Sequence, residues 1–344
     1  MMENKKAGNI HVRFATIDDN ERLLKIEQES AQEGNIWLVA FREDFFGRLK
    51  YFEEGFIMIA EDAYDIIGCI GVGIDRLIVN GEIKKAIYLF GLRTNPKYRL
   101  KVARWLRSII QELQNLLGPT DFDFGYASVK ADNVASKKIL EHMGFSTTAT
   151  LDFYACPVRK TSREKSVFVE REVDLETILD LYRPLEKDRD FLLQGTKAFE
   201  SMVAERRLRL FKTEGASALV LDTSGEQDFG ITRLSKGLRA FQLLAQRTLS
   251  PLVRIPRMNE RLRSWDVLLF DWGDIRSARR TVRKIHRCAW EEGITLINFS
   301  RDRSLGSMKD ALGLLSFRIP FEIMIYEKNG INRGSRPIIR TPTI

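Results

Sequence analysis

The stretch AIYLFGLRTNPKYRLKVARWL, residues 86–106, contains a strand pattern, a break and a helix start in immediate succession. Asn95 and Pro96 make the break, because the residue before a proline is pushed toward extended conformations and proline suits the opening of a turn. Several basic residues then lead into a helical pattern. Since the first N–H groups of a helix are unpaired and its dipole is positive at that end, the stretch predicts a site for phosphate groups.

Hydrophobic periodicity on both sides of this stretch predicts alternating strands and helices. Up to about Arg159 their order is β-α-α-β-β-β-α-β-α-β, which indicates an α/β fold with a mixed sheet covered by helices. The expected strands are residues 12–18, 56–63, 66–79, 84–94, 122–129 and 148–158, and the expected helices are residues 20–30, 41–54, 99–118 and 133–144.

The chain of 344 residues is longer than one hydrophobic core usually supports, so two domains are expected. Residues 161–165 are charged and lack an apolar pattern, which places the boundary between a first domain, 1–160, and a second, 161–344. The end of the second half repeats the element order of residues 87–156, which predicts a tandem duplication. Its elements are strand 266–272, helix 275–293, strand 295–301, helix 307–317 and strand 321–328.

The composition is that of a folded globular protein, with 44% hydrophobic residues. The three cysteines, Cys69, Cys156 and Cys288, are widely spaced, so neither a disulfide framework nor a structural metal site is expected. No apolar run is long enough to span a membrane, and the first fifteen residues lack the apolar core of a secretory signal. These features predict a soluble cytoplasmic protein without a membrane partner.

The net charge of +8 is compatible with nucleic acid, an anionic membrane surface or an anionic cofactor. Most basic residues are spread among acidic ones, as on a solvated surface, with denser runs at 276–287 and 333–340. The run 276–287 has no interleaved aromatic residues on which bases could stack, and no recognition motif accompanies it. The pattern therefore argues against a nucleic-acid partner.

A second motif, Asn133, Ser136 and the pair Gly144-Phe145, follows residues 86–106. Together the two stretches resemble the GCN5-related N-acetyltransferase (GNAT) family. In that family an R/Q-x-x-G-x-G/A turn binds the pyrophosphate of coenzyme A, and an N-x-x-A/S helix start with a later G-F follows it. The resemblance implies the GNAT fold and acetyl-CoA as cofactor.

The resemblance also implies a role for each part of these motifs. Leu92, Arg93 and Thr94 would pair through their backbone with the pantetheine arm, and Asn133 and Ser136 would lie near its end. The plain alternatives are an ordinary sheet strand for residues 92–94 and a helix cap for Asn133. The pyrophosphate would lie at the turn formed by Arg99, Leu100, Lys101, Val102, Ala103 and Arg104.

Two departures from the family pattern bear on this site. Val102 and Arg104 stand where the family has small residues that let the phosphates approach the backbone. Their side chains would crowd a pyrophosphate, although Arg104 and Lys101 could also pair with it. The family often has a tyrosine in the helix after Asn133 that protonates the leaving thiolate, and here that residue is Leu140.

Acyl transfer to an amine needs a base for the ammonium proton and a way to stabilise the departing sulfur. The candidate catalytic groups are the carboxylates of Glu61 and Asp75 and the phenols of Tyr126 and Tyr154. For each of them the plain alternative is a surface charge or a core aromatic ring. The sequence therefore assigns no catalytic residue.

Over its whole length the chain is similar to the plant HOOKLESS-type N-acetyltransferases, in which a GNAT domain precedes a divergent GNAT-like half. The shared features are Gly91-Leu92-Arg93 at a strand end, the N-x-A-S helix start, and a second half without the R-x-x-G-x-G pattern.

We therefore expect an N-acetyltransferase that moves an acetyl or another short acyl group from acetyl-CoA to the primary amine of a small molecule or peptide. The second half would shape the acceptor side or mediate pairing into a homodimer. The leading alternative is a non-catalytic acyl-CoA-binding or regulatory protein. The sequence leaves the acceptor, the acyl chain length and the oligomeric state open.

Overall fold

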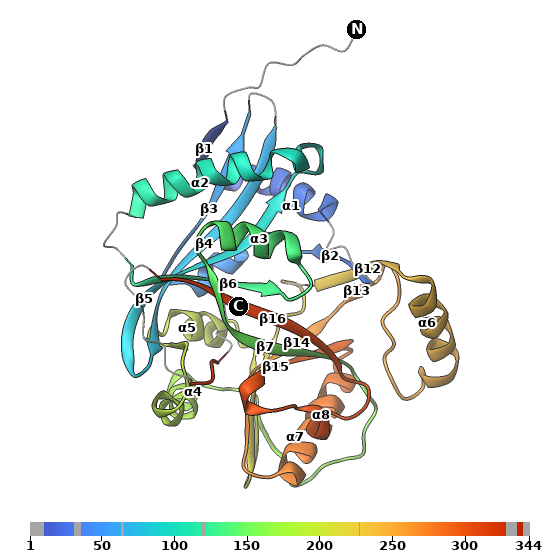
Figure 1. Ribbon diagram of the computed structural model, residues 1–344. Helices are drawn as coiled ribbons and strands as arrows, with labels where there is room; N and C mark the ends of the chain where they lie inside the picture. The colour runs from blue at the N-terminus through green and yellow to red at the C-terminus, as the bar shows by residue number, and fades with distance from the viewer. Residues whose placement is uncertain are drawn as a thin grey trace.

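The computed structural model describes residues 10–30, 36–62, 65–117, 122–226, 228–327 and 336–339 (Figure 1). Within residues 10–160 the predicted order of strands and helices is confirmed except at one place. The elements are β1 His11–Phe14, α1 Asn20–Glu29, β2 Ile36–Phe41, β3 Glu54–Glu61, β4 Ile66–Val79, β5 Glu82–Thr94, α2 Val102–Leu117, β6 Phe124–Lys130, α3 Val134–His142 and β7 Ser146–Pro157.

The exception is the helix expected over residues 41–54. Residues 36–41 form β2 instead, and only Gly47–Tyr51 form a short 3-10 helix, η2. Gly47 disfavours a longer helix because glycine loses more conformational freedom there than other residues. The strand forms because β2 pairs antiparallel with β12, Asp228–Leu234, a partner far along the chain. Local sequence patterns do not report such a pairing.

The second half supplies both strands and helices, and it repeats the order strand, helix, strand, short helix, strand seen from β5 to β7. The helix expected over 307–317 is reduced to the single turn α8, Lys309–Leu312. The remaining elements are β8 Phe168–Glu170, α4 Leu175–Tyr182, β9 Leu192–Leu193, α5 Lys197–Ala204, β10 Leu208–Thr213, β11 Ala216–Asp222, α6 Lys236–Leu249, β13 Arg261–Leu262, β14 Ser264–Trp272, α7 Ile275–Glu291, β15 Leu296–Asp302 and β16 Phe317–Glu327.

One large mixed sheet runs through both halves in the order β1-β3-β4-β5-β6-β16-β7-β15-β14-β11-β10-β8. The two halves exchange their last strands. β16, from the end of the chain, pairs antiparallel with β6 of the first half, while β7 pairs antiparallel with β15 of the second half. β16 and β7 also pair with each other at the centre of the sheet. Figure 1 shows β16 and β7 running side by side there.

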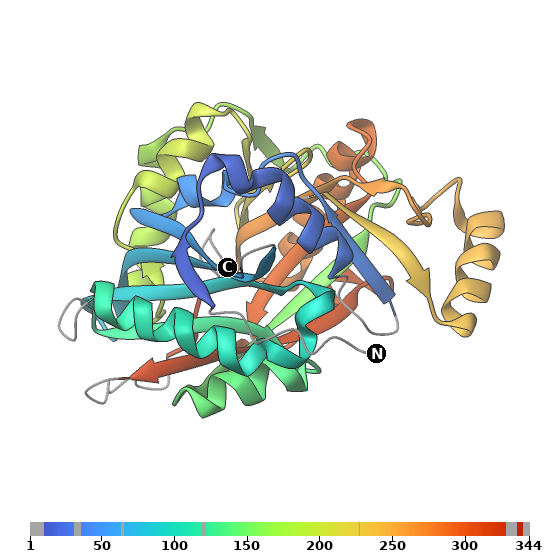
Figure 2. The same cartoon turned by 90° about the horizontal axis from the view of Figure 1, so that it is seen from above.

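The first-half strands bury two different faces (Figure 2). On the α1 face, Tyr88 and Phe90 of β5 pack with Leu23 and Ile26 of α1. On the α2 face, alternate residues of the same strands pack under α2 and α3. The core of the α1 face also contains four second-half residues, Phe191, Ile323, Ile325 and Ile338.

Separating the halves at residue 160 is expected to unfold the first half. Fragment 1–160 would lack β16 and the four second-half residues of the α1-face core, so β6 would keep an open edge and the core would be exposed. Circular dichroism and gel filtration of fragment 1–160, alone and co-expressed with 161–344, measure this. A monomeric, cooperatively folded fragment 1–160 would show that the first half is autonomous.

Candidate functional site

Strands β5 and β6 separate partway along their length. They pair in parallel from Ala86 opposite Phe124 to Leu89 opposite Ala127. Beyond Leu89, among the described residues, β5 pairs with β4 alone and β6 with β16 alone. We call this separation, between residues 90–94 and residues 128–130, the strand fork. Its two inner edges carry backbone groups without a strand partner, which a ligand can use.

A β-bulge lies in β5 at the fork. Two residues, Gly91 and Leu92, lie opposite the single residue Ile70 of β4. Gly91 has a φ of +60°, a left-handed conformation that glycine adopts without steric cost. A bulge takes its extra residue out of the hydrogen-bond ladder, so it leaves backbone groups near Gly91 without ladder partners beside the fork.

The turn after β5 is fixed by Asn95. Its side chain accepts a hydrogen bond from the Lys97 N–H (3.1 Å) and donates one to the Ile66 carbonyl (3.0 Å). These bonds satisfy a polar side chain that is only 4% exposed and tie the turn to the start of β4. Pro96 then opens a 3-10 helix, Pro96–Lys101, that continues into α2. The predicted break and helix start are confirmed.

The first turn of α2 is held close to the sheet by Trp105. Its ring is fully buried against Gly68 of β4, and a Cβ atom at Gly68 would lie 2.5 Å from it. Only glycine therefore allows this contact. Val102 packs against the core of the α2 face, while Arg104 is exposed.

The expected pyrophosphate turn, residues 99–104, thus coincides with the end of the 3-10 helix and the N-terminus of α2. No acidic residue occupies the first turn of α2. The side chains of Arg99, Leu100, Lys101 and Ala103 lie outside the described part of the structure.

On the other side of the fork, α3 begins shortly after β6 ends at Lys130. Asn133 caps this helix, its side-chain oxygen accepting a hydrogen bond from the Ser136 N–H at 3.1 Å. Asn133 is thus the N-cap of α3, as in the plain alternative, and Asn133 and Ser136 both lie at the β6 side of the fork. Leu140, at the position where the GNAT family often has a tyrosine, is buried in the core of the α2 face.

An ion cluster that the sequence analysis missed lies on the α1 face beside the bulge. Glu27 of α1 is 6% exposed and forms two bonds with Arg42, of 2.6 and 2.9 Å. Arg93 of β5 donates to the same carboxylate at 3.2 Å. The cluster ties α1 and the end of β2 to the strand that carries the bulge. Its members are far apart in sequence, so no motif announces it.

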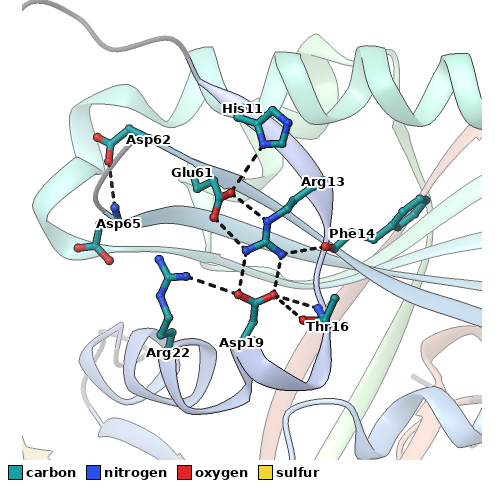
Figure 3. Close-up of polar contacts among 9 residues, drawn as sticks. All are labelled: His11, Arg13, Phe14, Thr16, Asp19, Arg22, Glu61, Asp62 and Asp65. Atoms are coloured by element: carbon teal, nitrogen blue, oxygen red, sulfur yellow. Dashed lines mark hydrogen bonds and ion pairs between the residues drawn. The ribbon is translucent and has the colours of Figure 1, made fainter.

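Glu61, a predicted catalytic candidate, is part of a different polar network (Figure 3). Arg13 bridges Glu61 (2.9 and 3.0 Å) and the buried Asp19 (2.7 and 2.9 Å), and His11 approaches Glu61 at 3.6 Å. The bonds from Arg13 lower the pKa of the Glu61 carboxyl. This network joins β1, β3 and the start of α1, and it gives Glu61 a structural partner.

Asp75, the second carboxylate candidate, lies on β4 and is only 3% exposed. One of its oxygens accepts a hydrogen bond from the Glu53 N–H at 3.0 Å, and the other has no partner among the described residues. Burial raises the pKa of the Asp75 carboxyl to about 7, against the opposing effect of the Glu53 N–H. In the β4–β5 ladder Asp75 lies opposite Ala86. The pair formed by Val72 and Leu89, where the fork begins, is three residue pairs further along this ladder.

The two phenol candidates, Tyr126 and Tyr154, lie in different cores, because β7, which carries Tyr154, pairs with strands of the second half. Tyr126 is fully buried one position before the end of the β5–β6 pairing, stacked on Tyr88 with ring centres 4.7 Å apart. Tyr154 of β7 lies in the second-half core, where its hydroxyl accepts a hydrogen bond from the Met308 N–H at 3.4 Å. The structure brings Tyr126 to the fork and places Tyr154 in another core.

Other kinds of site find no support in the described residues. Histidine, cysteine, aspartate and glutamate nowhere gather there in a group of three that could hold a metal ion. The three cysteines are all free and buried. No helix in the described ranges is both long and apolar enough to cross a membrane.

Replacing Asp75 by asparagine is expected to stabilise the protein in a pH-dependent way. Between pH 4 and about 7 the unfolded carboxyl is ionised while the buried one keeps its proton, so the wild type loses stability as the pH rises. An asparagine side chain cannot ionise, so the Asp75→Asn variant should gain about 2–4 kcal/mol on the wild type from pH 4 to pH 8. Urea unfolding at several pH values measures the gain, and a constant difference would contradict it.

Replacing Glu27 by alanine is expected to cost about 3–5 kcal/mol of stability, because it leaves Arg42 and Arg93 without their shared buried counter-ion. Glu29, exposed on the same helix, is the matched control, and Glu29→Ala should change stability by less than about 0.5 kcal/mol. Urea unfolding of both variants makes the comparison. Equal effects would mean that the cluster contributes nothing beyond helix propensity.

Comparison with known proteins gives a likeness in structure alone. No protein-family model matches the sequence, and no curated protein matches it. The structure is similar to N-myristoyltransferase of Saccharomyces cerevisiae with bound myristoyl-CoA, at a TM-score of 0.62 and 9% identity over 95% of this chain and 82% of that one.

It is also similar to a candidate acetyltransferase of Pyrococcus horikoshii (TM-score 0.54, 13% identity, 96% of this chain and 93% of that one). A GCN5-related N-acetyltransferase of Kribbella flavida matches at a TM-score of 0.50 and 10% identity, over 94% and 72% of the two chains. The mixed sheet, the strand fork and the strand–turn–helix unit agree with this likeness. The chain therefore has the GNAT fold.

Proposed function

We propose that this chain is an N-acyltransferase that moves an acyl group from a coenzyme A thioester to an amine. The observation that carries the proposal is the strand fork, with its bulge at Gly91 on one edge and the N-terminus of α2 at its open end. The similar solved structures, named as N-acetyltransferases and an N-myristoyltransferase with bound myristoyl-CoA, support it.

The donor would bind along β5. The backbone at residues 99–104 and the positive end of the α2 dipole would hold the pyrophosphate, assisted by the exposed Arg104. Val102 does not oppose this, because its side chain packs into the core. The amide groups of the pantetheine arm would pair with the free edge of Leu92, Arg93 and Thr94, with Asn133 and Ser136 across the fork.

In the transfer step the amine nitrogen attacks the thioester carbonyl carbon, so a C–N bond forms and the C–S bond breaks. Backbone N–H groups at the bulge are placed to donate to the carbonyl oxygen as it gains negative charge. Asp75, with a pKa of about 7, suits the uptake of the amine proton. It lies about 10 Å from the fork along the strand, so the proton would reach it through an intervening group.

The acceptor would be the primary amine of a small molecule or peptide, and the second half would shape its binding site. Second-half residues already enter the α1-face core, where Phe191 lies against Tyr126 with ring centres 5.2 Å apart. The acyl group expected from the sequence is acetyl, carried by acetyl-CoA.

A non-catalytic acyl-CoA-binding protein is the second candidate. Leu140 favours it, because a buried aliphatic side chain stands where a phenol would protonate the leaving thiolate. Such a protein would bind the thioester without releasing its thiol.

Reversing the charge of Arg104 is expected to weaken acetyl-CoA binding about 10- to 100-fold, because a charge-assisted bond to phosphate would be replaced by repulsion. Arg247 is the matched control, since it is exposed on α6, a helix that projects away from the fork in Figures 1 and 2. Isothermal titration of the wild type, Arg104→Glu and Arg247→Glu measures the effect. Equal affinities in all three proteins would place the phosphates elsewhere.

Thiol release from acetyl-CoA and from longer acyl-CoA thioesters, measured with a panel of small amines and amino-terminal peptides, then separates the two candidate functions. Release that depends on an acceptor supports the transferase. Tight binding without release for any acceptor would favour the non-catalytic protein.

A further inference from the structure

A large apolar pocket lies between α2 and α3, on the α2 face of the sheet. Its volume is about 620 Å³. Ile87 and Leu89 of β5, Gly125 of β6 and Tyr326 of β16 line it on the sheet side, and apolar residues of the two helices form its walls. The polar residues among its lining, such as Arg107 and Lys138, are exposed.

The pocket starts where the strand fork closes. Leu89 lines the pocket and is also the last residue of β5 that pairs with β6. A pantetheine arm that runs from the turn at 99–104 along β5 would bring its thioester to the bulge at Gly91. A chain that continues beyond the carbonyl in the same direction passes Leu89 and then Ile87, about 7 Å further along the strand.

We propose that this pocket binds the hydrocarbon chain of the acyl donor, so that the protein uses a medium- or long-chain acyl-CoA in place of acetyl-CoA. This inference rests on the proposed function. An acetyl group has a single methyl group beyond the carbonyl and would leave the pocket empty. A volume of 620 Å³ is in the range of pockets that enclose drug-sized apolar ligands.

The affinity of the donor should therefore rise with chain length. Burying one methylene group strengthens binding about fourfold, until the chain fills the pocket. Titration calorimetry with CoA, acetyl-CoA, octanoyl-CoA and tetradecanoyl-CoA, below their micelle concentrations, measures this dependence on the full-length protein.

Gly125 offers a way to shorten the pocket. A Cβ atom there would meet its nearest neighbour, the Phe145 ring, at 3.6 Å, an ordinary contact, so alanine fits. The larger side chain of Gly125→Leu should occupy the pocket. We expect Gly125→Leu to weaken tetradecanoyl-CoA binding at least tenfold and to leave CoA binding unchanged, with Gly125→Ala close to the wild type. Ile110→Trp, from the opposite wall, repeats the test if Gly125→Leu does not fold.

The outcomes separate this inference from the proposed function. If CoA and acetyl-CoA bind but affinity does not depend on chain length, the pocket does not hold the chain and the proposed function stands. If no CoA compound binds, the proposed function fails as well. Binding of free tetradecanoate that is as tight as that of its CoA thioester, and that does not compete with CoA, would make the pocket a separate lipid site and overturn the inference.

Discussion

The antiparallel pairing of β16 with β6 on one side and β7 on the other is the interaction on which the rest of the structure depends. Without it β6 and β7 would each expose an edge of unpaired N–H and C=O groups near the middle of the sheet. β16 also contributes to both faces, because Ile323 and Ile325 pack in the core of the α1 face and Met324 packs in that of the α2 face. The sheet and both first-half cores are therefore completed by residues from near the end of the chain.

The strand fork follows from this arrangement. β5 is held on its outer side by β4, and β6 on its outer side by β16, so the two strands can part beyond Leu89 without losing those ladders. The energetic cost falls on the inner edges, whose backbone groups need a partner. Apolar side chains could cover these backbone groups but could not form hydrogen bonds with them. A ligand that has amide groups of its own can form those bonds. The Gly91 bulge leaves further backbone groups near this edge without ladder partners.

The sequence predicted the elements that local patterns determine. β4 was predicted with its observed limits, because its residues are mostly β-branched, other apolar residues or glycine and lie between two polar turns. The turn at Asn95-Pro96 follows from the chemistry of those two residues. It missed β2, the exchange of β7 with β16, and the cluster around Glu27. Each of these depends on residues distant in the chain, and neither periodicity nor spacing carries that information.

The same distinction applies to the side chains of the predicted site, whose surroundings depend on the assembled fold. Val102 looked like an obstacle to phosphate because it stands where the resembled family has a small residue. In the fold it belongs to the helix face that packs on the sheet. The sequence likewise offered Glu61 and Asp75 as equals. Glu61 forms an ion pair with Arg13, whereas Asp75 is buried without an ion-pair partner among the described residues. These environments appear only when the strands are assembled.

The two halves also differ at their corresponding strand pairs and helix starts. β14 and β15 pair in parallel over three residues and then separate, as β5 and β6 do. In the second half a side-chain contact spans the two strands, because the guanidinium of Arg301 on β15 lies 4.0 Å from the ring centre of Trp272 on β14. The N-terminus of α7 is capped by Asp274, which accepts a hydrogen bond from the Ser277 N–H at 2.9 Å. A carboxylate at that point repels phosphate and uses the N–H groups that would bind it, whereas α2 begins without an acidic residue in its first turn. The order of elements is shared, but α7 begins at a capping carboxylate and α2 does not, which is why the proposed donor site lies in the first half.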